Sequence, residues 1–390
     1  MTRSKKILHV AWLKARYGGA HKYLDRLVKR LLNQQYLVTI AVNQQELDRP
    51  FLKQLEMQGA TVIYLPLEFD ARKSAKQIDE LIERERTDIV HFNSGARQPR
   101  SAARHMVSWQ SRRFCSVFTM HLPLVRAQPN FGTRVKKNVP FTRARKRLDE
   151  RVDFARRFDR IISVSERFAA INVRELKLNS GHIVTIPNGV DVTKFTPVLD
   201  TDHTRNSGKI VIGGCGGLVP QKRFDLLIDA IAVIGSASVT VRIAGEGPER
   251  DRLQEMINRH GLGDQVYLEG HVADVPAFLR QLDIFVMPSD YEAFPYSQLE
   301  AMATGLPSVV TDVGDLPLLV RDDIDGLVIP TGDSQALSAA LKSLMTKKNK
   351  RMLMGKSARD HVVEHFEQQD CESRTVDLFS SLLNREMAGG

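Results

Sequence analysis

The sequence has only three cysteines and no cluster of closely spaced thiols. Cys115, Cys215 and Cys371 lie far apart, and none belongs to a CxxC pair or to a spacing typical of zinc sites. The pattern therefore favours neither a disulfide framework nor a zinc fold, and we interpret these residues as reduced structural thiols.

Long hydrophobic runs are also absent. No apolar run approaches the roughly 18 residues that span a bilayer. The basic N-terminus followed by Ile7–Leu13 resembles a secretion signal, but His9 interrupts the run, Lys14 ends it, and no small-residue cleavage site follows. We therefore expect a buried first strand and a cytoplasmic protein.

The charge is unevenly distributed between the two halves of the chain. Residues 1–200 carry 37 Lys and Arg against 19 Asp and Glu, whereas residues 201–390 carry 19 against 27. A basic first half favours an acidic partner, such as a nucleotide, an anionic acceptor or an anionic membrane surface. Nucleic acid is not expected, because nothing in the sequence places stacking aromatics among the basic residues in the manner of single-strand binders.

Short apolar runs alternate with amphipathic segments along the chain, and the pattern restarts after residues 196–209, which are rich in turn formers. This order predicts an α/β protein with two Rossmann-like domains and parallel sheets. We expect an N-terminal domain at 1–195, a C-terminal domain at 209–367, and a last helix at about 368–390 that packs back on the first domain. The expected strands are Ile7–Leu13, Leu37–Val42, Thr61–Leu65, Ile89–Phe92, Ser116–Met120, Arg160–Val164, Ile210–Gly214, Val239–Ala244, Val266–Leu268, Ile284–Met287, Ser308–Thr311 and Leu327–Ile329.

The segment Ser289–Pro307 is the most informative part of the chain. Pro295 suits a first helical position and Gly305 a position just past a helix end. Glu292 then lies in the loop before this helix and Glu300 in its second turn, so both carboxylates can face a ligand docked at the helix start. Carboxylates accept hydrogen bonds from sugar hydroxyls, and the N–H groups of a helix start favour phosphate.

This segment resembles the Glu-x7-Glu signature of the retaining glycosyltransferases with the GT-B fold, the family-four type also called group 1. The resemblance covers most of the chain. Its further motifs are Gly18-Gly19, His121 in Thr-Met-His-Leu-Pro, Ser163-Val-Ser165, Ile186-Pro-Asn-Gly-Val-Asp191, Val219-Pro-Gln-Lys222, Gly245-Glu-Gly-Pro248, Asp312-Val-Gly314 and Gly326-Leu-Val-Ile-Pro330. It implies two Rossmann-like domains that face each other across a cleft, with acceptor binding in the first and donor binding in the second.

The resemblance also implies roles for individual residues. Glu300 would hold the ribose hydroxyls, Glu292 would hold a hydroxyl of the donor sugar, and Lys222 would neutralise the departing pyrophosphate. His121 would lie near the anomeric carbon. The other residues implied at the donor site are Gly18, Gly19, Asn188, Arg223, Ala293, Phe294, Pro295 and Leu299. Transfer would follow a front-face mechanism, in which a donor phosphate oxygen takes the acceptor proton.

The sequence departs from the family pattern beside Lys222. Gly217 stands where the family usually has an arginine that contacts the pyrophosphate, and Arg223 stands where glycine is common. Arg223 is a candidate for supplying the missing charge. Ala293 replaces a usual glycine, with little expected effect.

Simpler interpretations of the same residues remain open. Glu292 and Glu300 also suit solvated helix-start acids, and Lys222 suits a surface charge. His121 alone would fit a packed histidine, and Asn188 in Pro-Asn-Gly is a turn signal in its own right.

Two other motifs are interpreted as structural. Gly214-Cys-Gly216 lacks the third glycine of a dinucleotide fingerprint, and no acidic residue closes a strand about 20 positions further on. Asp323-Ile-Asp325 spells the triplet of metal-dependent glycosyltransferases but lies in a polar turn. We therefore expect no metal and no other cofactor.

The basic segment 134–160 holds 11 Lys and Arg, and Leu148, Val152, Ala155 and Phe158 mark one helical face. Such a helix either lies on an anionic membrane surface or docks on its own domain. The first alternative would place the protein peripherally at the inner face of the plasma membrane.

The predicted function is retaining transfer of a sugar from a nucleotide-sugar donor, with UDP favoured, to a glycan or lipid-linked acceptor of cell-surface polysaccharide or lipopolysaccharide. One alternative is a nucleotide-sugar-modifying enzyme such as an epimerase on the same fold. The other is a basic module that binds nucleic acid or membrane without catalysis.

Overall fold

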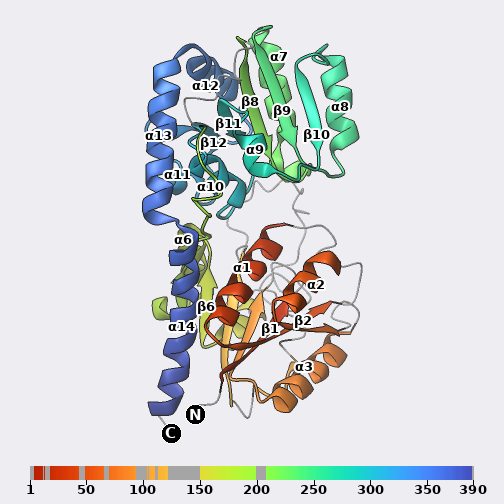
Figure 1. The fold of residues 1–390 in the computed structure, drawn as a ribbon, viewed down its shortest axis with the longest axis vertical. Coiled ribbons are helices and arrows are strands. Elements are labelled where there is room, and N and C mark those ends of the chain that lie inside the picture. The colour runs from red at the N-terminus through yellow and green to blue at the C-terminus, as the bar shows by residue number, and fades with distance from the viewer. Residues whose placement is uncertain are drawn as a thin grey trace. The chain divides into compact units, whose positions relative to one another are not determined.

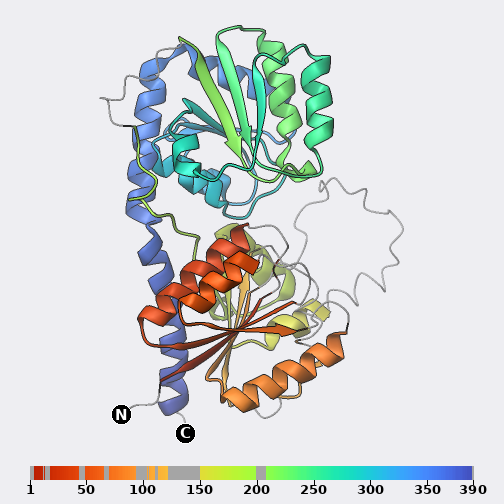
Figure 2. The same ribbon diagram turned by 45° about the vertical axis from the view of Figure 1, so that its right-hand side comes forward.

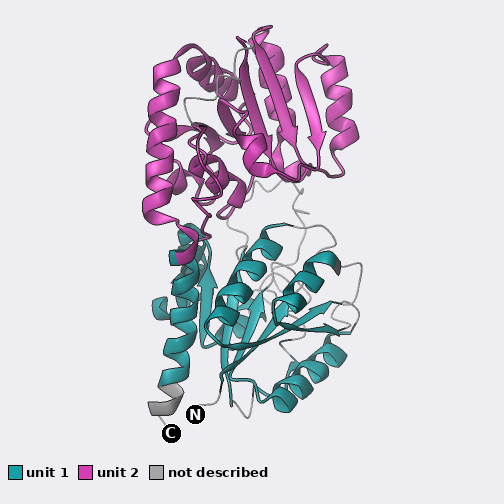
Figure 3. Ribbon diagram, in the orientation of Figure 1, with its two compact units in different colours: residues 1–187, 370–390 teal, residues 188–369 magenta. Residues whose placement is uncertain are grey.

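The computed structural model describes residues 4–11, 13, 18–43, 49–65, 70–93, 103, 105–109, 113–121, 150–198 and 208–388. The chain divides into two compact units (Figure 3). The first comprises Met1–Pro187 and Asp370–Gly390, and the second comprises Asn188–Gln369. Both are parallel-sheet Rossmann-like units, as the sequence predicts.

The described part of the first unit contains a seven-stranded parallel sheet in the order β3-β2-β1-β4-β5-β6-β7. Its strands are β1 (Lys6–Ala11), β2 (Leu37–Asn43), β3 (Thr61–Leu65), β4 (Ile89–Asn93), β5 (Cys115–Met120), β6 (Arg160–Ser163) and β7 (Ile183–Thr185). The strand order reverses between β1 and β4, the kind of place where α/β sheets bind ligands. The expected strands correspond to observed ones, and β7 adds a short edge strand.

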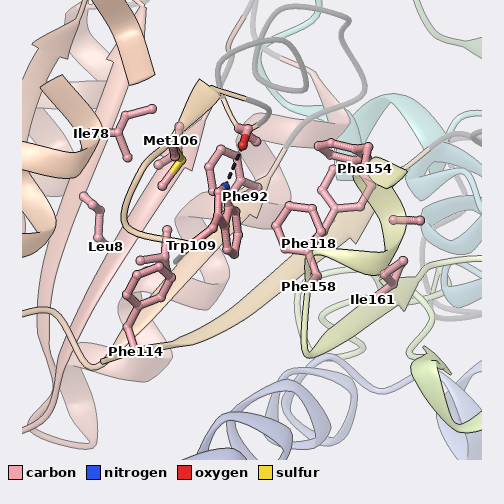
Figure 4. Packing of buried hydrophobic residues seen from close by; sticks show 14 of the residues in the cluster. Leu8, Ile78, Phe92, Met106, Trp109, Phe114, Phe118, Phe154, Phe158 and Ile161 are labelled. Carbon is pink, nitrogen blue, oxygen red and sulfur yellow. Dashed lines mark hydrogen bonds between the residues drawn. The ribbon is translucent and has the colours of Figure 1, made fainter. Parts of the chain in front are cut away.

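Helices cover both faces of this sheet (Figures 1 and 2). They are α1 (Gly19–Asn33), α2 (Arg49–Met57), α3 (Ala71–Glu85), a helix at 150–156, α6 (Glu166–Leu176) and α14 (Gln368–Ala388). On one face, Phe92, Trp109, Phe118 and Phe158 pack into an aromatic core (Figure 4), and the Trp109 indole donates to the Ala103 carbonyl at 2.6 Å. The opposite face is filled mainly by α1, α2 and α14.

The second unit, within the described residues, contains a six-stranded parallel sheet in the order β10-β9-β8-β11-β12-β13, which reverses between β8 and β11. Its strands are β8 (Ile210–Cys215), β9 (Val239–Ala244), β10 (Val266–Gly270), β11 (Ile284–Met287), β12 (Ser308–Thr311) and β13 (Gly326–Ile329). Its helices are α7 (Phe224–Ile234), α8 (Arg250–Arg259), α9 (Val275–Leu279), α10 (Tyr296–Ala303), α11 (Leu316–Leu319), α12 (Ser334–Thr346) and α13 (Lys348–His365).

The chain passes between the units at two places. Residues 188–195, which the sequence analysis assigned to the first domain, pair with the second unit instead: the Val190 amide donates to the Phe366 carbonyl at 2.9 Å. The last helix, α14, packs Val376, Phe379 and Leu382 into the core of the first unit. The boundary therefore differs from a simple sequential split. Residues 188–195 form backbone hydrogen bonds with the second unit, and α14 packs its apolar side chains into the first.

Candidate functional site

The loop between β11 and α10 carries the two predicted carboxylates. Pro295 caps α10 in an extended conformation, so the helix begins at Tyr296 and places Glu300 on its second turn. Glu292 is 7% exposed and Glu300 is 1% exposed. Buried carboxylates must be paired or hydrogen-bonded, so these are not solvated helix-start acids.

Glu292 is held by two donors on one oxygen. The Lys222 ammonium lies 2.5 Å from its Oε1, and the Ser289 hydroxyl donates to the same atom at 2.9 Å. Thr311 in turn donates to the Ser289 carbonyl at 2.6 Å. The lysine side chain is itself only 16% exposed. The structure therefore brings together two residues that the sequence analysis proposed separately.

The loop that carries Glu292 is fixed by its backbone. The Asn188 amide donates to the Phe294 carbonyl at 2.6 Å, and the Asp315 N–H donates to the Ala293 carbonyl at 3.1 Å. A Cβ at Gly314 would lie 2.0 Å from the Glu292 carbonyl, so only glycine fits there. The Asn188 side chain thus stabilises the loop through the Phe294 carbonyl. The Pro-Asn-Gly turn signal did not reveal this contact.

Glycines let the loops after β8 and β9 pack backbone against backbone. A Cβ at Gly245 would lie 1.8 Å from the Gly216 carbonyl, and one at Gly247 would lie 2.1 Å from the Leu218 carbonyl. A Cβ at Gly216 would lie 3.1 Å from Cε of Lys222. The stem of Lys222 therefore passes over a glycine on its way to Glu292.

Arg223 pairs with carboxylates other than the Glu292 that binds Lys222. Its backbone is left-handed, with φ 50°, and its guanidinium bonds to Asp225 Oδ1 at 3.1 Å and Asp290 Oδ1 at 3.0 Å. Two carboxylates already balance its charge. A Cβ at Gly217, in contrast, would meet nothing closer than the Glu246 carbonyl at 3.8 Å.

Gly18, Gly19 and His121 belong to the first unit, whereas the other predicted site residues belong to the second. Gly18 caps α1, and its N–H donates to Nδ1 of His21 at 3.2 Å. A Cβ added at Gly18 would meet nothing within 4 Å. The backbone at the start of α1 is therefore uncrowded by the described residues.

His121 follows β5 and is held by two residues that the sequence analysis missed. Its Nε2 lies 2.6 Å from Oδ1 of Asn93, and the Tyr23 ring meets it edge-on with the centroids 4.9 Å apart. Burial lowers the pKa of His121 to about 4, so the ring is neutral near pH 7. Because the Asn93 oxygen accepts, Nε2 carries the hydrogen and Nδ1 has the lone pair. Asn93, a polar residue at the end of a buried strand, was a detectable signal.

The Asp-x-Asp triplet is used structurally. Asp325 is fully buried and pairs with the Arg321 guanidinium at 2.7 Å, and Asp323 pairs with Lys350. Across the described parts of the chain, His, Cys, Asp and Glu form no group of three that could hold a metal ion.

The basic segment is described only from residue 150 onward; Leu148 and the rest of 134–149 lie outside the described residues. In the described part, Phe154, Ala155 and Phe158 are buried in the core of the first unit. This stretch of the helical face docks on its own domain. None of the described helices has the length and apolar character to cross a bilayer.

Comparison with known families and proteins gives consistent matches. The family described as Glycosyltransferase Family 4 matches residues 17–194, and the family Glycosyl transferases group 1 matches residues 197–361. The lipopolysaccharide core biosynthesis mannosyltransferase LpsB of Rhizobium meliloti is 30% identical over 54% of this chain and 63% of its own length. An Escherichia coli protein, UDP-Gal:alpha-D-GlcNAc-diphosphoundecaprenol alpha-1,3-galactosyltransferase, is 26% identical over 80% of both chains.

Not all matches extend over whole proteins. Mannosylfructose-phosphate synthase of Agrobacterium fabrum is 32% identical, but the match spans 42% of its length. Among solved structures, a glycosyltransferase of Rickettsia africae aligns with a TM-score of 0.79 at 18% identity, covering 97% of this chain and 99% of that one. Anabaena HepE in complex with UDP aligns with a TM-score of 0.79 at 20% identity, covering 96% and 100%. These structural matches identify the fold.

Proposed function

Because the chain belongs to the family 4, group 1 glycosyltransferases with the GT-B fold, we propose that it transfers a sugar from a UDP-sugar, with retention, to a glycan or lipid-linked acceptor. The observation that carries the proposal is the buried pair between Lys222, in the turn after β8, and Glu292, in the loop directly before the helix that bears Glu300. These residues of the second unit offer one cation and two carboxylates, which suits a phosphate and several hydroxyls.

Each group has a task that its chemistry suits. The Lys222 ammonium neutralises the negative charge that grows on the diphosphate as the glycosidic bond breaks. When Lys222 turns toward the phosphate, Glu292 accepts a hydrogen bond from a hydroxyl of the donor sugar. Glu300 accepts hydrogen bonds from the ribose hydroxyls. The Anabaena protein that shares the fold is described as a complex with UDP, and this favours uridine as the base.

Positive charge at the phosphates comes from the protein in this proposal, and no metal is required. Lys222 and the N–H groups at the start of α10 supply it. His121 contributes a neutral ring on the first unit, with Nε2 bound to Asn93 and Nδ1 as a hydrogen-bond acceptor. Catalysis is then mainly positioning and charge stabilisation, with a donor phosphate oxygen taking the acceptor proton in a front-face reaction.

Two relatives support a surface-glycan acceptor for this chain. One is named for lipopolysaccharide core synthesis and another for a diphosphoundecaprenol-linked acceptor. We therefore propose a surface-glycan acceptor. If that acceptor is lipid-linked, the enzyme acts at the inner face of the plasma membrane.

Thermal-shift screening against UDP, GDP, ADP and UDP-sugars tests the donor site, because a ligand that binds only the folded state raises the melting temperature. A shift with uridine nucleotides alone supports the proposal. A shift with GDP alone would mean that the donor carries guanine and not uracil. Turnover of a UDP-sugar to another sugar nucleotide without an acceptor would favour an epimerase.

A further inference from the structure

The first unit contains a chain of buried polar side chains that the proposed donor chemistry does not use. His9 Nδ1 lies 2.8 Å from His91 Nδ1, and His91 Nε2 lies 2.7 Å from the Thr119 hydroxyl. The Thr119 hydroxyl lies 3.0 Å from the Tyr23 hydroxyl. We call these four residues the polar chain. It connects β1, β4, β5 and α1 in sequence.

The polar chain lies on the face of the sheet that α1 and α14 cover. His9, His91 and Thr119 are fully buried among apolar neighbours such as Ile7 and Phe379. The Phe379 ring on α14 meets His91 edge-on at 5.4 Å. Polar groups in such a core cost stability relative to well-packed apolar ones, so their presence calls for a reason other than packing.

The hydrogen bonds of the polar chain have a direction. Burial lowers the pKa of His9 to about 3 and holds that of His91 well below its ordinary value, so both rings are neutral. His9 Nε2 has no partner among the described residues. A buried lone pair without a partner costs less than a buried N–H, so His9 carries its hydrogen on Nδ1. His9 then donates a hydrogen bond to His91, His91 donates one to the Thr119 hydroxyl, and Thr119 donates one to the Tyr23 oxygen.

The polar chain ends beside His121. Thr119 is two residues before His121, and Tyr23, anchored by Thr119, presents its ring to the His121 imidazole at 4.9 Å. Asn93, which binds His121 Nε2 at 2.6 Å, is two residues after His91 on β4. The imidazole is thus restrained by a hydrogen bond at one nitrogen and by a fixed aromatic ring against one edge.

We propose that Tyr23 is a positioning residue for His121: its hydroxyl, anchored by Thr119, fixes the ring that orients the imidazole toward the reacting sugar. This inference rests on the proposed function together with the position near the anomeric carbon that the family resemblance implies for His121. Tyr23 itself touches no reacting atom. Its effect is on the orientation of His121, where an error of ~1 Å can cost ~100-fold in rate.

The test compares two tyrosine-to-phenylalanine changes. Tyr23→Phe removes the hydroxyl that bonds Thr119 and Thr375. Tyr36→Phe is the matched control, because the Tyr36 hydroxyl makes an equivalent 3.0 Å bond to Ser380 in the same unit but without contact to His121. We expect Tyr23→Phe to lower kcat about tenfold with KM for the donor within about twofold, and Tyr36→Phe to leave kcat within about twofold. Equal kcat values for the two variants at equal melting temperatures would overturn the proposal.

A second readout does not need turnover. The ring ¹⁵N chemical shifts of His121 report its hydrogen bond to Asn93 and the position of its proton. We expect them to move in Tyr23→Phe and in Tyr23→Leu but not in Tyr36→Phe. If wild-type protein transfers no sugar, the proposed function fails while these shifts still decide the role of Tyr23; unmoved His121 shifts in both Tyr23 variants would refute it.

Discussion

Lys222 and Glu292 lie 70 residues apart in the sequence and form an ion pair with the ammonium nitrogen 2.5 Å from Oε1 of the carboxylate. A nucleotide phosphate offers the same lysine a second anion, and a sugar hydroxyl offers the same glutamate a second partner. The ion pair therefore holds both side chains next to the loop before α10, where their opposite charges neutralise each other.

Breaking this pair from either side should destabilise the second unit. Lys222→Met leaves a largely buried carboxylate without its cation, and we expect the free energy of unfolding to fall by about 2–3 kcal/mol. Lys222→Met combined with Glu292→Gln should cost less than the sum of the single changes by at least about 1 kcal/mol. Chemical denaturation of all four proteins measures this coupling. Additive losses would mean that the two side chains do not interact in solution.

Gly217 offers a gain-of-function test of the phosphate site. The family resemblance places an arginine there, and a Cβ added at this position would meet nothing closer than 3.8 Å. Because Arg223 is already paired with Asp225 and Asp290, we expect Gly217→Arg to tighten UDP binding by about fivefold, or ~1 kcal/mol. Gly217→Gln controls for size without charge. Isothermal titration calorimetry compares them; equal affinities in the two variants would place the diphosphate elsewhere.

His121→Ala separates chemistry from donor binding. The imidazole lies on the first unit, and the proposed nucleotide contacts lie on the second, so UDP affinity should stay within about threefold while kcat falls at least about 100-fold. Initial rates and calorimetry measure the two quantities. Losses of similar size in both would indicate that His121 only packs.

The buried histidines predict acid sensitivity. His9 has a folded pKa of about 3, against 6.5 when unfolded, and burial also holds the pKa of His91 well below its ordinary value. Between about pH 6.5 and 3 the unfolded chain binds protons that the folded chain does not, so stability falls as pH falls. The two residues together give a slope of up to about 3 kcal/mol per pH unit. Melting temperatures measured from pH 7.5 to 5 should drop; a flat profile would show that the two rings have the same pKa in the folded and the unfolded chain, as exposed rings do.

The two Rossmann-like sheets were predictable because their signals are local. Buried parallel strands such as β8 and β11 appear as short apolar runs bounded by turn residues, and Pro295 marked the start of α10 within one residue. The boundary between the units was less predictable, because the partner of Val190 is Phe366, far along the chain.

The donor loop was found from a motif, but its internal contacts were not. Nothing local joins Lys222 to Glu292 or Asn188 to the Phe294 carbonyl; the topology of the sheet brings them together. The polar chain was missed for the same reason. His9 appeared in the sequence only as an interruption in an apolar run, and its partner His91 follows 82 residues later.

In the proposed function, Glu300 and Lys222 hold a nucleoside diphosphate without help from a metal. The most direct test is calorimetric titration of UDP, in buffer containing EDTA, into wild-type protein, Glu300→Ala and the surface control Glu255→Ala on α8. We expect wild-type protein and Glu255→Ala to bind UDP alike and Glu300→Ala to lose about tenfold in affinity or more. Equal binding by Glu300→Ala, or wild-type binding that returns only when manganese is added, would contradict this expectation.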